Sequence, residues 1–471
     1  MPNYATLPNI QYPPRWVAAQ SFPLSRSSTG VIAVQADIEI DPYQIVHMNC
    51  PFFSGFYSPL EDAWVSSLST VTTLAAGNAA CWHPGGPTGT ALGATATTIQ
   101  IPFTATRKLA GYVIRITGGK GAGQERTISK NTLGSNSTFT VTTPWTTIPD
   151  NTSTYQLRTG RFYYYNSDGN FLYMELADFN VTSPLATINL PGATGGNAAL
   201  CATYGGTLVT GVPTASTSTT LTDSTKNWTA SQFVNFQVRI TSGTGAGQVR
   251  TISASTATSI TVSAAWTTQP DGSSVYVIEG NEDNIYLMVN NTLYMRWYNI
   301  STNTWFTNTT FLRSYVSGFA SLHHINRETH PLWVQESALL NGRYIYSFAG
   351  AGNQLERYDL TTSSWSTIAS SLLFPDNLST GSSTCYAHGY LYFRRGVGQL
   401  YRLSPSRCMS DPLPEWPAVN SGTIYGPYFG PTAGYHNVLF AAKMPVGSGY
   451  SRRIYGWADN TFNGYYLQEN F

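Results

Sequence analysis

Four residues of the segment LHHINRETH carry side chains that could hold a metal ion. His323, His324, Glu328 and His330 offer imidazole and carboxylate groups, which are common zinc ligands. Their spacing differs from the H-E-x-x-H of helical zinc sites, and no helical pattern here places two imidazoles on one face. Histidine also precedes another strand-like segment, at His388 before GYLYF. We therefore expect these histidines to lie in turns or at strand starts, and we predict no metal site and no cofactor.

Two glycine-rich segments, Gly121–Gln124 and Gly245–Gln248, share the text GAGQ and could cradle a phosphate through backbone N–H groups. A P-loop continues as Gly-Lys-Ser/Thr into a helix, whereas Glu125-Arg126 and Val249-Arg250 lead into strand-like sequence. Tight turns that need glycine at positive φ are the better account. The residues that define this repeat are Gly121, Gly123, Gln124, Arg126, Gly245, Gly247, Gln248 and Arg250. The arginines expected to brace both copies are Arg115, Arg126, Arg239 and Arg250.

The sequence contains no recognisable set of catalytic residues for a hydrolase. The segment NSDGNF at Asn166–Phe171 lacks the Ser-x-Asp-x-Gly-x-x-Trp spacing of a sialidase Asp-box, so its Asp-Gly indicates a hairpin turn. The sequence contains no Gly-x-Ser-x-Gly elbow. Glycosidases need two carboxylates roughly 5–10 Å apart, and the 24 acidic residues give no reason to single out one pair. The sequence therefore favours a protein that is not an enzyme.

The cysteines indicate neither a zinc site nor a disulfide framework, because none has a C-x-x-C spacing. They are Cys50, Cys81, Cys201, Cys385 and Cys408. Cys81, Cys201 and Cys385 occupy the same place in a repeated segment. We expect equivalent positions of successive repeats to lie beyond disulfide distance, so that these thiols serve as small buried hydrophobes.

Charge and hydropathy exclude several classes of partner. Only 10% of the residues are charged and the net charge is +1. The 25 lysines and arginines are scattered, whereas a nucleic-acid surface needs clustered basic residues. No apolar run approaches the roughly 18 residues that span a bilayer. The start of the chain lacks the basic and apolar regions of a secretory signal. We therefore predict no nucleic-acid partner and no membrane span.

An aromatic residue followed by a second large residue seven positions later recurs along the chain. The clear copies are Tyr57–Trp64, Tyr298–Trp305 and Tyr358–Trp365, and the degenerate copies are Phe179–Ala186, Tyr401–Cys408 and Tyr455–Phe462. Hairpin-like text such as IYLMVNNTLYM precedes them. The last three intervals are 60, 43 and 54 residues, which suits the roughly 40–50 residues of a four-stranded blade. The pattern predicts an all-β chain that folds as a roughly six-bladed propeller.

A second repeat is nested in the first. Its shared text is RIT-x-G-x-GAGQ-x-RTIS, followed by a tryptophan and a Pro-Asp turn. Alternating Val, Ile and Thr broken by Gly and Pro predicts a compact antiparallel module, and two such insertions explain the long early intervals. The expected organisation is an extended N-terminal arm at 1–30, propeller segments at 31–94, 158–214 and 279–471, and inserted modules at 95–157 and 215–278.

Both repeats resemble known families. The segments YNISTNTW and YDLTTSSW look like kelch-type propeller blades. The GAGQ module is similar to small β modules in structural proteins of tailed bacteriophages. That resemblance implies a virion component, made in the cytoplasm of a bacterial host. The resemblance of propellers to parts of nozzle-type tail proteins favours the tail or neck over the capsid exterior. Its expected partners are other virion proteins and further copies of itself, arranged as a ring or in multiple copies.

Two other functions are compatible with the sequence. One is a carbohydrate-binding receptor module on the virion surface, in which Trp145 and Trp266 would stack on a host surface glycan. We favour the interpretation that these tryptophans fill module cores. The other alternative is a propeller enzyme that degrades polysaccharide.

Overall fold

The computed structural model describes the chain in segments. These are residues 15–19, 32–38, 40–50, 53–68, 79–165, 170–181, 185, 198–205, 207–289, 295–307, 323–325, 342–348, 355–369, 383–387, 390–394, 400–404, 409–413, 438–446, 449–457 and 464–469. Every helix or strand assigned within these segments is a β-strand, which confirms the all-β fold. Among the described residues there is no helix long and apolar enough to cross a membrane.

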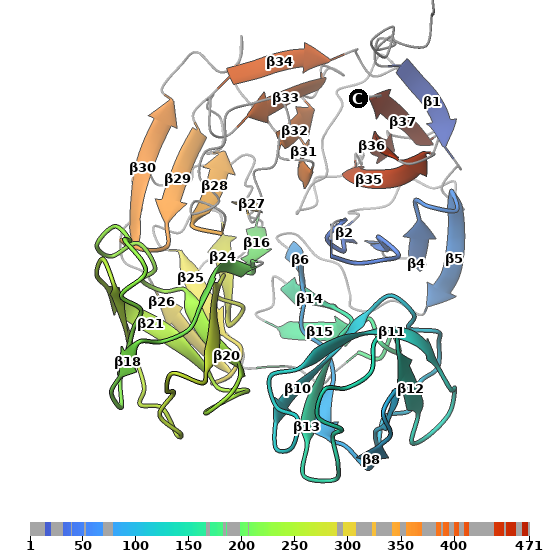
Figure 1. Cartoon of the computed structure of the whole chain (residues 1–471). Helices are drawn as coiled ribbons and strands as arrows, with labels where there is room; N and C mark the ends of the chain where they lie inside the picture. Colours follow the sequence, from blue (N-terminus) through green and yellow to red (C-terminus); the bar gives the residue numbers. More distant parts are fainter. Residues whose placement is uncertain are drawn as a thin grey trace, which may run out of the picture.

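Six small antiparallel sheets follow one another around a common axis and form a β-propeller (Figure 1). The first blade contains β2 (Ile32–Gln35), β3 (Val46–Cys50), β4 (Phe53–Ser58) and β5 (Ala63–Leu68). The next sheet has three strands, β6 (Ala79–His83), β14 (Arg161–Tyr165) and β15 (Phe171–Glu175). The following blade contains β16 (Ala198–Ala202), β24 (Asn284–Val289), β25 (Arg296–Asn299) and β26 (Thr304–Thr307).

Three further blades complete the ring. One contains β27 (His323–Ile325), β28 (Tyr344–Phe348), β29 (Leu355–Asp359) and β30 (Ser364–Ala369). The next contains β31 (Ser383–Ala387), β32 (Tyr390–Arg394), β33 (Leu400–Ser404) and β34 (Met409–Leu413). The last contains β35 (Val438–Val446), β36 (Gly449–Trp457), β37 (Gly464–Glu469) and β1 (Arg15–Ala19). The propeller is confirmed, but five blades are four-stranded rather than six, and a three-stranded sheet occupies the remaining sector.

A tight turn follows β15 and reverses the chain along the edge of that strand. Phe179 adopts φ 61°, and its N–H donates to the carbonyl of Glu175 at 2.8 Å. Its ring stacks on Phe56 of the neighbouring blade at 4.1 Å. Beyond the turn an isolated bridge joins Met174 to Val181, and the Leu185 N–H donates to the Phe171 carbonyl at 2.7 Å. The predicted repeat copy Phe179–Ala186 is therefore wrong, because Phe179 lies in a turn; Ala186 lies outside the described residues.

The N-terminal strand closes the ring. β1 pairs with β37 in antiparallel register, so that Arg15 lies opposite Gln468 and Ala19 opposite Gly464. The first strand of the chain is thus the outermost strand of the last blade. The expected arm at 1–30 is corrected in this respect, since residues 15–19 belong to the propeller. The ring centroids of Tyr57 in the first blade and Tyr455 in the last blade are 6.1 Å apart, so these side chains connect the first and last blades.

The aromatic repeat is a cross-strand pair between the third and fourth strands of a blade. Tyr57 lies opposite Trp64, Tyr298 opposite Trp305 and Tyr358 opposite Trp365. The ring centroids are 5.4, 5.3 and 5.3 Å apart. In all three hairpins the residue two before the tryptophan has a left-handed backbone, namely Asp62, Asn303 and Ser363 with φ of 49°, 51° and 52°. The short polar turn thus fixes the register that brings the two rings together.

The other two degenerate copies do not form this pair. Tyr401 lies opposite Pro412 rather than Cys408, and Tyr455 lies opposite Tyr466 rather than Phe462. Tyr401 lies three residues before the end of β33 and Tyr455 two before the end of β36, whereas the tyrosine of each clear copy is next to last in its strand. The seven-residue spacing therefore identifies three of the hairpins. It does not identify the hairpins of the remaining blades.

Apolar clusters lie between successive sheets, as expected for radially packed blades. Phe56 of the first blade packs with Phe162 of the three-stranded sheet. Tyr358 packs against Met288 of the preceding blade, and Leu391 lies in one cluster with the preceding blade's Leu355. These clusters make the propeller a stiff support for the segments inserted in it.

Candidate functional site

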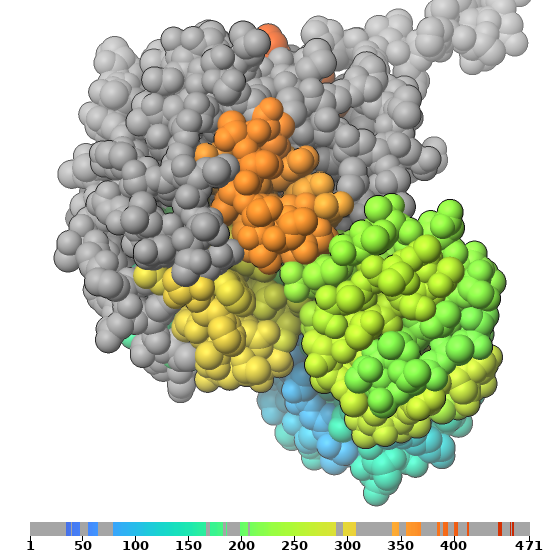
Figure 2. Space-filling view, turned by 90° about the vertical axis from the view of Figure 1, so that its left-hand side faces the viewer, coloured from blue at the N-terminus to red at the C-terminus, as the bar shows by residue number. Residues whose placement is uncertain are grey.

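Two modules stand side by side on one face of the propeller (Figures 1 and 2). Module 1 contains β7 (Thr88–Thr90), β8 (Gly93–Ala94), β9 (Thr98–Gln100), β10 (Val113–Gly118), β11 (Glu125–Asn131), β12 (Thr138–Val141) and β13 (Thr154–Arg158). Module 2 contains β17 (Thr207–Gly211), β18 (Ala215–Ser216), β19 (Thr220–Thr222), β20 (Gln237–Ser242), β21 (Val249–Ser255), β22 (Ser259–Val262) and β23 (Val275–Glu279). Each is inserted between the first and second strands of its sheet, which places both on the same face.

The two modules have one topology. The strand orders are β7-β13-β10-β11-β12-β9-β8 and β17-β23-β20-β21-β22-β19-β18. β7 and β8 lie at opposite edges of this order although only two residues separate them in the chain. The sheet must therefore curl until its edges meet, as a barrel does. The strands begin at Thr88 and Thr207, before the expected starts at 95 and 215, because the first strand of each module pairs with its last.

The GAGQ and W-T-T segments of each module hold one another. In module 2 the side-chain oxygen of Gln248 accepts from the N–H groups of Thr267 and Thr268 at 2.7 and 3.2 Å. Its Nε2 donates to the carbonyls of Gly245 and Thr268 at 3.0 and 2.7 Å. Gln124 makes the same four bonds in module 1. The glutamine thus fixes the turn, and both glycines of each loop have positive φ, as the interpretation of these segments as tight turns requires.

Trp145 and Trp266 fill the module cores and do not present a face to a sugar. Their residues are 4% and 6% exposed. Arg126 lies over the Trp145 ring at 5.4 Å, and Arg250 lies over the Trp266 ring at 5.6 Å. The candidate role of these two tryptophans in glycan stacking is therefore wrong, whereas Arg126 and Arg250 brace their modules as expected.

We expect Gln248→Ala to destabilise module 2 by about 2 kcal/mol, because two carbonyls and two N–H groups lose their partner. Gln248→Glu should cost a similar amount, since a carboxylate keeps the acceptor but cannot donate to Gly245 and Thr268. Hydrogen exchange of peptides from β20 and β21 measures the effect. Unchanged protection in both variants would contradict the assigned role of the amide.

The second glycine of each GAGQ loop lies at the contact between the modules. A Cβ on Gly123 would lie 2.2 Å from the carbonyl oxygen of Thr241 in module 2. A Cβ on Gly247 would lie 2.6 Å from the carbonyl oxygen of Thr117 in module 1. Because Thr117 and Thr241 occupy equivalent places, the contact is reciprocal, as across a two-fold axis. The second glycine of GAGQ therefore has two roles: it adopts a positive φ, and it lets the backbones of the two modules come into contact.

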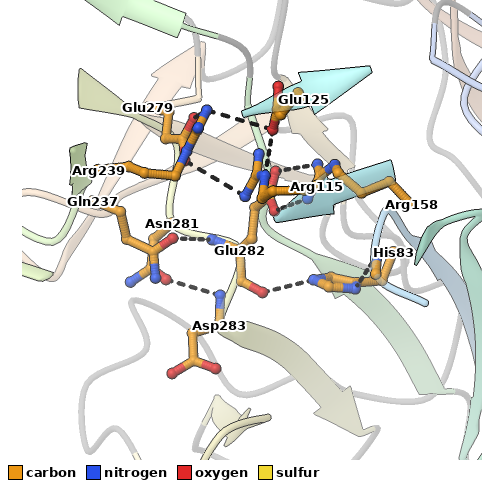
Figure 3. A network of polar contacts seen from close by, with 11 residues as sticks. His83, Arg115, Glu125, Arg158, Gln237, Arg239, Glu279, Asn281, Glu282 and Asp283 are labelled. Atoms are coloured by element: carbon orange, nitrogen blue, oxygen red, sulfur yellow. Dashed lines mark hydrogen bonds and ion pairs between the residues drawn. The ribbon is translucent and has the colours of Figure 1, made fainter. Parts of the chain in front are cut away.

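An ion network ties the two modules together at their bases (Figure 3). Arg115 pairs with Glu125 in its own module, and its Nη1 lies 4.0 Å from Oε1 of Glu279 in module 2. Arg239 pairs with Glu279 at 2.9 Å, and its Nη2 lies 3.6 Å from Oε1 of Glu125 in module 1. Each arginine thus contacts one carboxylate of its own module and one of the other.

A second connection joins module 1 to the segment that leaves module 2. Arg158 binds Glu282 through two hydrogen bonds of 2.7 Å. Burial alone would raise the pKa of Glu282, but the Arg158 guanidinium outweighs it and holds that pKa well below its usual range. The backbone N–H of Glu282 donates to Gln237, and His83 Nε2 lies 2.6 Å from its carbonyl oxygen. This buried ion pair fixes the exit of module 2 against module 1.

His83 is held in one neutral form. Its Nδ1 accepts from the N–H of Gly85 at 3.0 Å, so the proton resides on Nε2, which donates to the Glu282 carbonyl. Burial lowers the pKa of His83 to about 4. The imidazole is thus a fixed structural donor near neutral pH.

Module 1 is also attached to the first blade. Arg107 lies over the rings of Tyr43, Tyr112 and Phe179 at 5.3, 5.8 and 4.7 Å. Tyr112 donates to Asp41 at 2.8 Å, and burial raises the pKa of Asp41 to about 6. The module is therefore held to the propeller by aromatic and polar contacts on its inner side.

The remaining predicted sites are not brought together. The backbones of His323 and His324 form β27, while Glu328 and His330 lie outside the described residues. Within the described part, no three His, Cys, Asp or Glu side chains are grouped to hold a metal. Of the Asn166–Phe171 segment, residues 166–169 lie outside the described residues. Cys81 and Cys201 are buried free thiols.

Sequence reasoning missed Arg158, Glu279 and Glu282. Aligning the exits of the two modules, YQLRTGR at 155–161 and YVIEGNE at 276–282, would have exposed them as charges of opposite sign at equivalent positions. Neither a protein-family model nor a curated protein matches the chain.

Proposed function

We propose that this chain is a non-catalytic structural component of a tailed-phage virion, placed in the tail or neck rather than on the capsid exterior. It acts through protein–protein contacts made by the propeller faces, the two modules and the N-terminal segment. The observation that carries the proposal is the module pair: two copies of the phage-like module are fastened together and project from one face of the propeller.

Rigidity supports this function. A partner that binds across both modules loses little conformational freedom if the modules are already fixed relative to one another. Buried ion pairs and the reciprocal glycine contact provide that fixation. The propeller contributes a support with protected strand edges, whose loops can vary without disturbing the core. The low charge of the chain suits contacts with proteins better than contacts with nucleic acid.

The test removes the modules and asks whether the chain still enters particles. His83 lies opposite Arg161 and Ala202 lies opposite Ile285, so short turns can replace residues 84–160 and 203–284. We expect the full chain in purified particles, detected by mass spectrometry and gold labelling, and the module-free propeller at less than a tenth of that level. A folded module-free chain that enters particles as well as the full chain does would refute the role of the modules.

Absence of the full chain from particles would refute the virion assignment altogether. If the purified chain instead released reducing ends from a host polysaccharide, the enzyme alternative would replace it. Circular dichroism of the module-free chain serves as the control that the propeller has folded.

A further inference from the structure

The bases of the two modules carry opposite charges at equivalent positions. The strand registers match, since Val113 lies opposite Arg158 in module 1 and Gln237 lies opposite Glu279 in module 2. Three residues further on, Arg161 corresponds to Glu282. A repeat that is otherwise preserved thus has arginine in one copy and glutamate in the other at two places. Glu279 and Glu282 contact arginines of module 1, whereas Arg161 binds Glu175 of its own sheet.

The carboxylate that neutralises the shared arginine comes from a different strand in each module. In module 1, Arg115 pairs with Glu125 on β11. In module 2 the corresponding position is Val249, and Arg239 pairs with Glu279 on β23. Because of this exchange, each arginine finds a second carboxylate only in the other kind of module.

We propose that these charges are a pairing code, which selects module 2 as the partner of module 1 and rejects a second copy of module 1. The observed pair is balanced, with Arg115, Arg158 and Arg239 against Glu125, Glu279 and Glu282. The arginines and Glu279 and Glu282 are largely buried, with side chains no more than 16% exposed. An uncompensated charge at such a place is strongly unfavourable.

A second module 1 in the place of module 2 would break this balance. Arg115 would face an arginine where Glu279 now lies, and Arg158 would lose the countercharge that Glu282 supplies. Two copies of module 2 would have an excess of negative charge, because Glu279 and Glu282 would be present twice and Arg158 would be absent. The glycine contact alone cannot discriminate, since Gly123 and Gly247 are equivalent. Repulsion between like charges at the base therefore disfavours a pair of identical modules, which the symmetric backbone contact would accept.

The consequence concerns any assembly that brings many copies together. Modules that resemble one another could exchange between chains and link them at random. With the charge code, module 1 pairs only with a module 2, which its own chain always supplies at high local concentration. The code therefore excludes pairs of like modules, and the high local concentration keeps the remaining pair within its chain.

A charge-swap series on the full chain tests the code. Spin labels on genetically encoded non-cysteine side chains at Leu133 and Ala257, both exposed, report the distance between the modules. We expect one narrow distance in the unmodified chain and in the control Lys130→Glu, which makes the same charge change at an exposed position. Arg158→Glu and Glu282→Arg should each broaden the distribution and lower the narrow population at least tenfold.

Combining Arg158→Glu with Glu282→Arg should recover most of the narrow population, because opposite charges again face one another. Circular dichroism on each variant verifies the β-structure of the chain. A narrow distance in either folded single variant would overturn the proposal. Failure of the double variant to recover that distance would also overturn it, since the charges would then act only through local stability.

Discussion

Gly123→Ala is expected to cost about 2–5 kcal/mol and to separate the two modules. Two effects add at this position. Its φ of +87° lies in the region that disfavours a side chain, which costs about 1–2 kcal/mol. The new Cβ would also lie 2.2 Å from the Thr241 carbonyl oxygen of the other module, and such overpacking costs about 1–3 kcal/mol more. Hydrogen exchange of peptides from β10 and β20 measures the loss in both modules.

Gly134→Ala is the matched control. Gly134 has a φ of +97°, and a Cβ there would meet nothing within 4 Å. It should therefore show only the backbone cost of about 1–2 kcal/mol, confined to module 1. Equal effects of the two substitutions, or an effect of Gly123→Ala that never reaches module 2, would contradict the reciprocal contact.

Glu282→Gln is expected to destabilise the joined modules by about 3–5 kcal/mol at pH 7. The amide leaves the buried Arg158 guanidinium without a countercharge, which is the costly way to break a buried ion pair. Lys120→Ala serves as the comparison, because it removes the pair of Lys120 with Asp150, whose side chains are 53% and 40% exposed. That change should cost less than about 1 kcal/mol. Denaturant unfolding followed by hydrogen exchange measures both.

The effect of Glu282→Gln should also depend on pH. The folded pKa of Glu282 lies below its unfolded value, so the ionised carboxylate stabilises the fold above the unfolded pKa of about 4.3. That stabilisation is lost as the pH falls from there through the folded pKa. The difference between the unmodified chain and Glu282→Gln should therefore be full at pH 7 and shrink below pH 4. A difference that is the same at pH 7 and pH 3 would mean that the carboxylate acts by shape and not by charge.

Local sequence was sufficient to predict the elements that local contacts build. Tyr298 and Trp305 are seven residues apart and lie opposite one another across one turn, so their spacing alone predicts the hairpin. Gln248 contacts Gly245 and the W-T-T turn of the same module, and both belong to the repeated text. These features appear as repeated sequence motifs because all the residues that contact one another lie within one short segment of the chain.

Long-range partners could not be predicted in this way. β1 pairs with β37 across nearly the whole length of the chain, and no local pattern in Arg15–Ala19 specifies that edge. The turn at Phe179 packs its ring against Phe56 of another blade, a contact that no local pattern specifies. Tyr401 and Tyr455 match the aromatic spacing, but both lie farther from the end of their strand than the tyrosines of the clear copies and therefore meet other partners.

The site shows the same division. The sequence favoured a core position for Trp145 and Trp266 over glycan stacking, and both residues are buried. Arg158 and Glu282 are 124 residues apart in the sequence, and their pairing depends on two modules lying side by side. The sequence did contain opposite charges at equivalent positions of RTGR and EGNE. These charges can be interpreted as partners only when the two modules are known to be in contact.

The most direct test of the account is a cryo-electron microscopy map of the tailed-phage particles in which we propose that this chain resides. We expect density for the propeller in the tail or neck, with both modules together against neighbouring virion proteins and in the pairing shown in Figure 3. A map without this chain would contradict the account. A map in which the chain is held by other surfaces while the module pair touches nothing would contradict it equally.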